Sequence, residues 1–153
     1  MISLGISKTG LVRQRNEDRF YAQGPLLIVA DGMGGYTGGE YASTMVVDTI
    51  VEVVNEATEM STDVLQNAIL QANRIVYEKS QSYKELEGMG TTAVVAYVQE
   101  DALYWAHVGD SRLYRYGEDG LHRMTKDHSM VQQLVEAGTI TEEEVIHHPK
   151  RNM

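Results

Sequence analysis

The sequence contains a glycine-rich stretch that begins with a carboxylate, Asp31-Gly32-Met33-Gly34-Gly35. It follows the apolar run Pro25–Ala30 and precedes a helical pattern, an arrangement typical of phosphate-binding loops. A P-loop would need Gly-Lys-Ser or Gly-Lys-Thr after its glycines, and neither tripeptide follows. The dinucleotide-binding pattern would need glycine at Thr37 and would place the Asp31 carboxylate beside an anionic pyrophosphate. A nucleotide-binding domain stays as one alternative interpretation.

The same stretch also fits a metal site, because a carboxylate beside a glycine lets a side-chain oxygen and a backbone carbonyl reach one hard cation. Two further acidic turns adjoin predicted strands, Glu17-Asp18 before one strand and Asp110 between two others. Each turn alone is also explained locally, since Asp and Gly are common in turns. Together with Arg13, the three turns favour an oxygen-ligated Mg²⁺ or Mn²⁺ site that acts on a phosphate.

Composition narrows the possible functions. The 153 residues are 42% hydrophobic with two prolines, which predicts one folded domain. Cysteine is absent, so disulfides, zinc sites built on thiolates and cysteine nucleophiles are excluded. The net charge of −9, without a basic cluster, argues against nucleic acid or an anionic membrane as a partner. No apolar stretch is long enough to span a bilayer, and we expect a cytoplasmic protein.

Hydrophobic periodicity predicts the elements that position these residues. Short strands are expected first, followed by two amphipathic helices with apolar residues at three-and-four spacing. Ser61 is the predicted N-cap of the second helix. The expected ranges are strands Ile2–Ser7, Arg19–Gln23 and Pro25–Asp31 and helices Ala42–Val54 and Leu65–Val76.

After Gly90 the pattern changes to β-branched and aromatic residues, which predicts a meander of antiparallel strands. Its expected strands are Thr91–Val98, Leu103–Val108 and Ser111–Tyr116. A short helix, Ser129–Ala137, and a capping box formed by Thr141 and Glu144 are expected to follow. Strands, two long helices and further strands together indicate an α+β layered domain.

Five segments, in this order and spacing, closely resemble those of bacterial type 2C protein phosphatases, which are metal-dependent serine/threonine phosphatases. The resemblance covers essentially the whole chain. Five ordered motifs are far more specific than any one of them. The segments are Arg13-x-x-Asn16-Glu17-Asp18, Asp31-Gly32-Met33-Gly34-Gly35, Gly88-Met89-Gly90-Thr91-Thr92, Val108-Gly109-Asp110-Ser111-Arg112-x-Tyr114 and Thr125-x-Asp127-His128-Ser129.

The resemblance implies an antiparallel β-sandwich flanked by helix pairs, with two or more Mn²⁺ or Mg²⁺ ions in a cleft at one end. Asp31 would bridge two of the metals, and the Gly32 carbonyl would bind one of them. Asp18 and Glu17 would support this site, largely through waters. Asp110 resembles the ligand of a third, weaker metal.

Arg13 resembles the arginine that grips the substrate phosphate, a role that suits its planar fork of donors. The implied reaction is hydrolysis of phosphoserine and phosphothreonine in proteins by a metal-activated water. Phosphorylated proteins, a serine/threonine kinase and the substrates of that kinase are the implied partners. Met33 departs from many eukaryotic relatives, which carry a histidine there, and methionine cannot donate a proton. His128 and His107 are expected to have local structural roles instead.

Family members continue beyond Met153 into strands that carry two further metal aspartates. Residues 1–153 are therefore expected to be the N-terminal part of one catalytic domain, incomplete at its C-terminus. We expect this chain alone to hold a partial metal site and to have impaired activity. A non-catalytic, phosphatase-like binding module is a further alternative. Metal preference and oligomeric state do not follow from the sequence.

Overall fold

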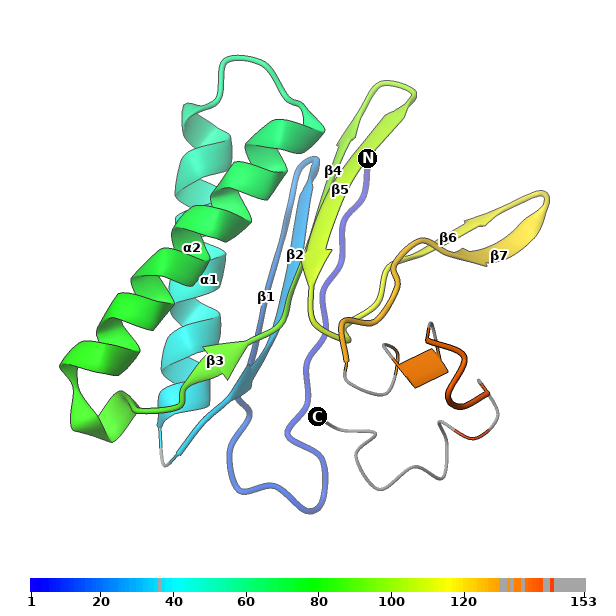
Figure 1. Ribbon diagram of the computed structural model, residues 1–153. Helices are drawn as coiled ribbons and strands as arrows, with labels where there is room; N and C mark the ends of the chain where they lie inside the picture. The colour runs from blue at the N-terminus through cyan, green and yellow to red at the C-terminus, as the bar shows by residue number, and fades with distance from the viewer. Residues whose placement is uncertain (36, 130–131, 133, 136, 142–143, 145–153) are drawn as a thin grey trace. The chain divides into compact units, whose positions relative to one another are not determined.

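The computed structural model describes residues 1–35, 37–129, 132, 134–135, 137–141 and 144. Its backbone divides into two compact units, Met1–His107 and Val108–Met153. The first unit holds a five-stranded sheet and two long helices, and the second holds a two-stranded sheet (Figure 1). Among the described residues, none of the helices has the length and apolar character needed to cross a membrane.

The sheet of the first unit has the strand order β1-β2-β4-β5, with the short strand β3 also paired to β2. β2 is antiparallel to both β1 and β4. Gly24, in the turn between β1 and β2, has a φ of 55°, a left-handed conformation that tight hairpins require and glycine adopts freely. The strands are β1 Asp18–Gln23, β2 Leu26–Met33, β3 Gly90–Thr91, β4 Ala93–Gln99 and β5 Ala102–Val108.

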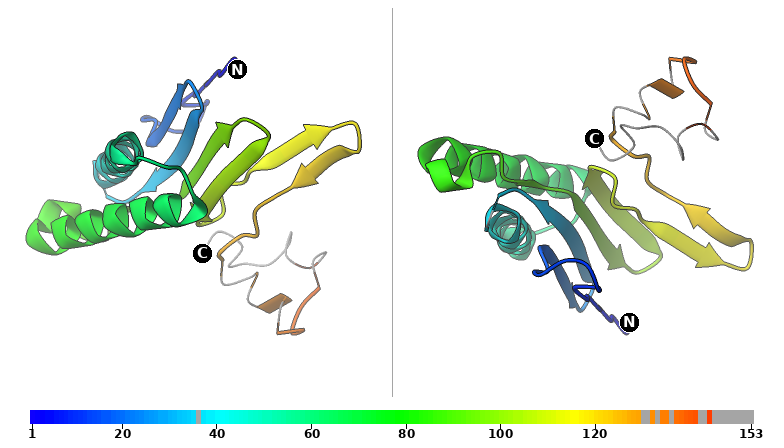
Figure 2. Two further views of the ribbon diagram at one scale, coloured as in Figure 1. Left: turned by 90° about the horizontal axis from the view of Figure 1, so that it is seen from above. Right: turned by 90° about the horizontal axis from the view of Figure 1, so that it is seen from below.

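Both helices lie side by side on one face of this sheet (Figures 1 and 2). They are α1, Gly38–Glu56, and α2, Thr62–Ser82. Both helices were predicted, and both extend beyond the predicted ranges because their outer turns contain glycine and polar residues that carry no apolar period. The predicted N-cap is confirmed, since the Ser61 hydroxyl accepts a hydrogen bond from the Val64 N–H.

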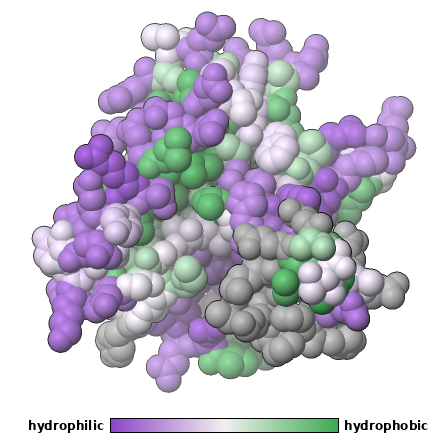
Figure 3. All heavy atoms as spheres, viewed as in Figure 1, coloured by the Kyte–Doolittle hydropathy of each residue, from purple (hydrophilic) through white to green (hydrophobic). Residues whose placement is uncertain are grey.

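The core lies between the helices and the sheet. β2 alternates, so that Leu26, Ile28 and Ala30 are buried against the helices while Val29 and Asp31 lie on the exposed face. Ile50 of α1 and Leu65 of α2, both fully buried, complete the same core. Hydrophilic residues predominate on the outer surface of the helix pair (Figure 3). β2 is therefore the element that separates the core from the exposed carboxylates.

The predicted strand at Ile2–Ser7 is wrong, because residues 2–7 form no strand. Ile2, Leu4 and Ile6 alternate as in a strand, yet all three residues are highly exposed, at 99%, 90% and 92%. The segment instead contacts β1 by close packing of Gly5 on the ring of Phe20. A segment with alternating apolar residues forms a strand only where the backbone of a neighbouring strand pairs with it.

The predicted meander holds for two of its strands and is wrong for the third. The run Thr91–Val98 is divided at Thr92 into β3 and β4, and Leu103–Val108 corresponds to β5. The run Ser111–Tyr116 instead contributes β6, Tyr114–Gly117, which pairs with the unpredicted strand β7, Gly120–Arg123, in a separate sheet. Gly120, with a φ of 99°, permits this tight hairpin.

The C-terminal predictions are only partly covered by the structure. Several residues of the predicted helix Ser129–Ala137 lie outside the described residues. Its predicted stop at Gly138 has a left-handed φ of 68°, and the Gly138 N–H donates to the Val135 carbonyl. The predicted capping box is confirmed: the Thr141 N–H donates to Glu144 Oε2 at 2.7 Å, and the Glu144 N–H donates to Thr141 Oγ1 at 3.3 Å.

Three backbone segments meet closely where α1 begins. A Cβ on Gly32 would overlap the Gly39 carbonyl, and a Cβ on Gly39 would lie 2.8 Å from the Glu17 side chain and 2.9 Å from the Gly32 backbone. No side chain fits at either position. The two glycines therefore let the end of β2, the start of α1 and the residue before β1 come together.

This contact predicts that Gly39→Ala lowers the free energy of unfolding by about 1–3 kcal/mol, as overpacking does, although alanine favours helices over glycine. Gly35→Ala is the matched control, because a Cβ there meets no described atom within 4 Å. Its change should stay within about 0.5 kcal/mol. Urea denaturation of the full-length protein measures both values. Equal stability of the two variants would show that the junction tolerates a side chain.

Candidate functional site

Asp18 and Asp31 face each other across the hairpin of β1 and β2. They are direct partners in the antiparallel ladder, which places their Cβ atoms about 4.5–5.5 Å apart and on one face. Since Ala30 points into the core, Asp31 and Asp18 project from the other, exposed face of the sheet. The structure therefore brings two of the predicted metal ligands side by side.

The backbone of Asp31 is held on both sides by Thr92. The Asp31 N–H donates to Thr92 Oγ1 at 3.0 Å, and the Thr92 N–H donates to the Asp31 carbonyl at 2.9 Å. Thr92 is the residue that separates β3 from β4, so the predicted strand is interrupted at the residue that binds the Asp31 backbone. The interruption turns a threonine hydroxyl toward Asp31, in place of a regular ladder bond.

Glu17 and Asp18, across the hairpin from Asp31, are held in place through the Glu17 backbone. The Glu17 carbonyl accepts hydrogen bonds from the Gly32 N–H at 3.3 Å and from the Ser43 hydroxyl at 2.6 Å. Ser43 is fully buried in the first turns of α1, and Glu17 itself is half-buried. The Asp18 N–H donates to Asn16 Oδ1 at 3.0 Å. These bonds fix the Glu17-Asp18 turn to both β2 and α1.

A cavity of about 390 Å³ adjoins this junction. It contains two cationic side chains, Arg13 and Arg15, next to the glycine turn. The sequence pointed to Arg13 and missed Arg15, for which the only signal was a second basic residue beside an acidic motif. The lining residues are Arg13, Gln14, Arg15, Glu17, Gly34 and Gly35.

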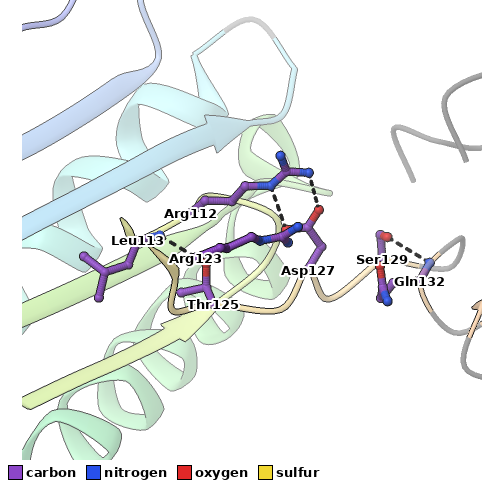
Figure 4. A network of polar contacts seen from close by, with 7 residues as sticks. All are labelled: Arg112, Leu113, Arg123, Thr125, Asp127, Ser129 and Gln132. Carbon is purple, nitrogen blue, oxygen red and sulfur yellow. Dashed lines mark hydrogen bonds and ion pairs between the residues drawn. The ribbon is translucent and has the colours of Figure 1, made fainter. Parts of the chain in front are cut away.

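Asp110, the remaining predicted ligand, belongs to the second unit and is exposed. Shortly after it in the chain comes Arg112, and the Asp127 carboxylate binds the guanidinium groups of both Arg112 and Arg123 (Figure 4). Burial raises the pKa of the Asp127 carboxyl, but both arginines more than offset this effect, so its pKa lies below the ordinary value. The bond to Asp127 raises the pKa of Arg112 in turn.

Within the described part of the chain, no three His, Cys, Asp or Glu side chains come close enough to form a metal-binding group. Asp18 and Asp31, with the half-buried Glu17 beside them, nevertheless supply the hard oxygen donors that Mg²⁺ and Mn²⁺ prefer. The donor chemistry therefore fits such an ion. Two of the three predicted acidic turns, Asp31 and Glu17-Asp18, therefore lie together in the first unit.

Comparison with known proteins decides the family. The model of the protein phosphatase 2C family matches residues 10–143, which include residues of both units. The chain belongs to the protein phosphatase 2C family. The serine/threonine phosphatase stp of Listeria innocua is 36% identical over 154 residues, a match that covers 94% of this chain and 61% of that protein.

Solved structures agree with this family. A crystal structure of the serine/threonine phosphatase PstP of Mycobacterium tuberculosis superposes with a TM-score of 0.90 at 37% identity, covering 99% of this chain and 65% of that one. The PstP catalytic domain in complex with two manganese ions superposes with a TM-score of 0.84, also at 37% identity, covering 94% and 63%. The α+β fold with antiparallel sheets and helices is thus that of a protein phosphatase 2C.

Met33, which cannot donate a proton, is 66% exposed at the end of β2. His107 lies on β5, with its ring 5.8 Å from that of Trp105. The backbone N–H of His128 donates to the Gly109 carbonyl at 3.0 Å. Neither histidine belongs to the group of residues that lines the arginine cavity.

Proposed function

We propose that the full-length protein containing this chain hydrolyses phosphoserine and phosphothreonine in proteins with the help of Mn²⁺ or Mg²⁺. The main support is the pairing of Asp18 and Asp31 beside a cavity that contains two arginines, in a member of the protein phosphatase 2C family. The related PstP catalytic domain is described with two manganese ions. A serine/threonine kinase partner and a cytoplasmic location stay predictions from the sequence.

The carboxylates Asp31 and Asp18 hold the metal centre in this proposal, together with the Gly32 carbonyl and, through waters, Glu17. When bound, the metal ions supply an activated water for attack on phosphorus. The chain itself holds the carboxylates in place through the bonds of Thr92 to Asp31 and of Ser43 to the Glu17 carbonyl. Pre-set ligands avoid the cost of ordering them at each turnover.

Arg13 grips the substrate phosphate, because its fork of N–H donors matches two phosphate oxygens. The arginine cavity, about 390 Å³, has room for a phosphate group with part of a side chain. The leaving serine or threonine oxygen needs a proton, which Met33 cannot supply. A water or another group donates it. Asp110 holds an additional, weaker metal in the same proposal.

Replacing the central ligand tests the metal site. Asp31→Asn in the full-length protein should lower kcat for a phenyl phosphate ester by about 100-fold or more, because loss of an outer-shell partner alone costs about 10–100-fold. Asp48→Asn, an exposed position on α1, is the control and should leave kcat unchanged. Near-normal turnover of Asp31→Asn at saturating Mn²⁺ would rule out Asp31 as the bridging ligand.

The two arginines of the cavity can be separated by kinetics. Arg13→Ala should raise KM for a phosphopeptide about tenfold, and lower kcat less, because a phosphate grip contributes mainly uniform binding. Arg13→Lys should restore part of the loss, since lysine keeps the charge without the fork. Arg15→Ala removes the same charge from the same cavity and should change KM less. A larger effect of Arg15→Ala would assign the grip to Arg15.

The length of the chain provides a further test. It spans 61% of the Listeria innocua relative that it matches, and the family resemblance puts two more metal aspartates in the unmatched part. Residues 1–153 alone should therefore show little Mn²⁺-dependent hydrolysis, and the full-length protein should be active. Equal specific activity of the two would mean that the ligands named above are sufficient.

A further inference from the structure

The loop that carries Asp110 is tied at both ends to one short segment, Asp127-His128. On one side of Asp110, the Gly109 carbonyl accepts a hydrogen bond from the His128 N–H at 3.0 Å. On the other side, the Arg112 guanidinium binds the Asp127 carboxylate. Gly109 has a φ of 96°, which glycine adopts at little cost. Asp110 thus lies between two fixed points, one residue from the first and two from the second.

The tie between Arg112 and Asp127 is bidentate. Arg112 Nε donates to Asp127 Oδ1 at 3.1 Å, and its Nη2 donates to Oδ2 at 2.7 Å. Arg123 donates to Oδ1 as well (Figure 4). The Asp127 side chain is only 13% exposed, against 45% for Arg112. A largely buried charge is costly unless it is paired, so Asp127 depends on its arginine partners. The two parallel bonds from Arg112 also fix the orientation of its guanidinium group relative to the Asp127 carboxylate.

Hydrogen bonds of Leu113 extend the hairpin of β6 and β7 toward Asp110. Tyr114 and Arg123 are the last paired residues of the two strands. Beyond them, the Leu113 carbonyl accepts from the Met124 N–H at 2.8 Å, and the Leu113 N–H donates to Thr125 Oγ1 at 3.1 Å. Thr125 is buried, at 5% exposure. One backbone bond and one side-chain bond therefore continue the pairing from the strand ends toward the Asp110 loop.

We propose that Arg112 and Asp127 are positioning residues that hold the Asp110 loop in the single conformation needed for its metal. This inference rests on the proposed function, in which Asp110 binds an additional Mn²⁺. Arg112 and Asp127 do not touch the reacting atoms; they act through the backbone on either side of Asp110. Arg123 strengthens the clamp by binding the same carboxylate from β7.

The test uses Asp127→Asn and Arg112→Lys in the full-length protein. Amide hydrogen exchange of residues 109–113 should be faster in both variants. The dissociation constant of the weakest-bound Mn²⁺, measured from free Mn²⁺ by electron paramagnetic resonance, should rise about 10–100-fold in Asp127→Asn, as for other outer-shell partners. Arg112→Lys should show a smaller rise, because lysine keeps the charge and loses the fork.

Asp119→Asn is the matched control, because Asp119 forms an ion pair with Arg115 at 2.6 Å in the same unit, both side chains being about half exposed. It should change neither measurement. Asp110→Asn separates the two hypotheses. If it weakens Mn²⁺ binding while Asp127→Asn and Arg112→Lys do not, the positioning role is refuted. If it leaves all Mn²⁺ binding unchanged, the assignment of Asp110 fails, and unchanged exchange in Asp127→Asn would refute the clamp itself.

Discussion

The close approach of Gly32 to the Glu17 backbone and to Gly39 is the constraint on which the candidate site depends. It lets the Glu17 carbonyl accept bonds from both the Gly32 N–H and the buried Ser43 hydroxyl. β1 therefore leaves this junction with Asp18 already opposite Asp31. A side chain at either glycine would separate the segments and, with them, the carboxylates.

The two units hold their acidic residues by different means. In the first unit, backbone groups and the small hydroxyls of Ser43 and Thr92 fix the carboxylates on a sheet whose other face is the core. In the second, a charged pair, Arg112 and Asp127, holds the loop of Asp110. Short backbone-based ties allow little movement, whereas a partly exposed ion pair responds more readily to salt and solvent.

The sequence predicted β1, β2, both helices and the capping box, because alternation, apolar periodicity and cap residues are local signals. It also grouped Asp18 and Asp31, which the hairpin pairs. Residues 2–7 were mispredicted because a strand needs a partner that alternation cannot reveal. The hairpin of β6 and β7 was missed because its two strands are only four residues long and mostly exposed, so they carry little apolar alternation. Arg15 was missed because the cavity that it lines forms only when its segment meets the distant Gly34-Gly35 turn in the fold.

We propose that Asp31 and Asp18 are the central ligands of a metal centre in this member of the protein phosphatase 2C family. A crystal structure of the full-length protein with Mn²⁺, using anomalous diffraction to locate the ions, tests this claim most directly. We expect an anomalous peak within coordination distance of the Asp31 carboxylate and on the exposed face of β2. Mn²⁺ bound elsewhere, with both Asp31 and Asp18 outside its coordination and hydration shells, would contradict it.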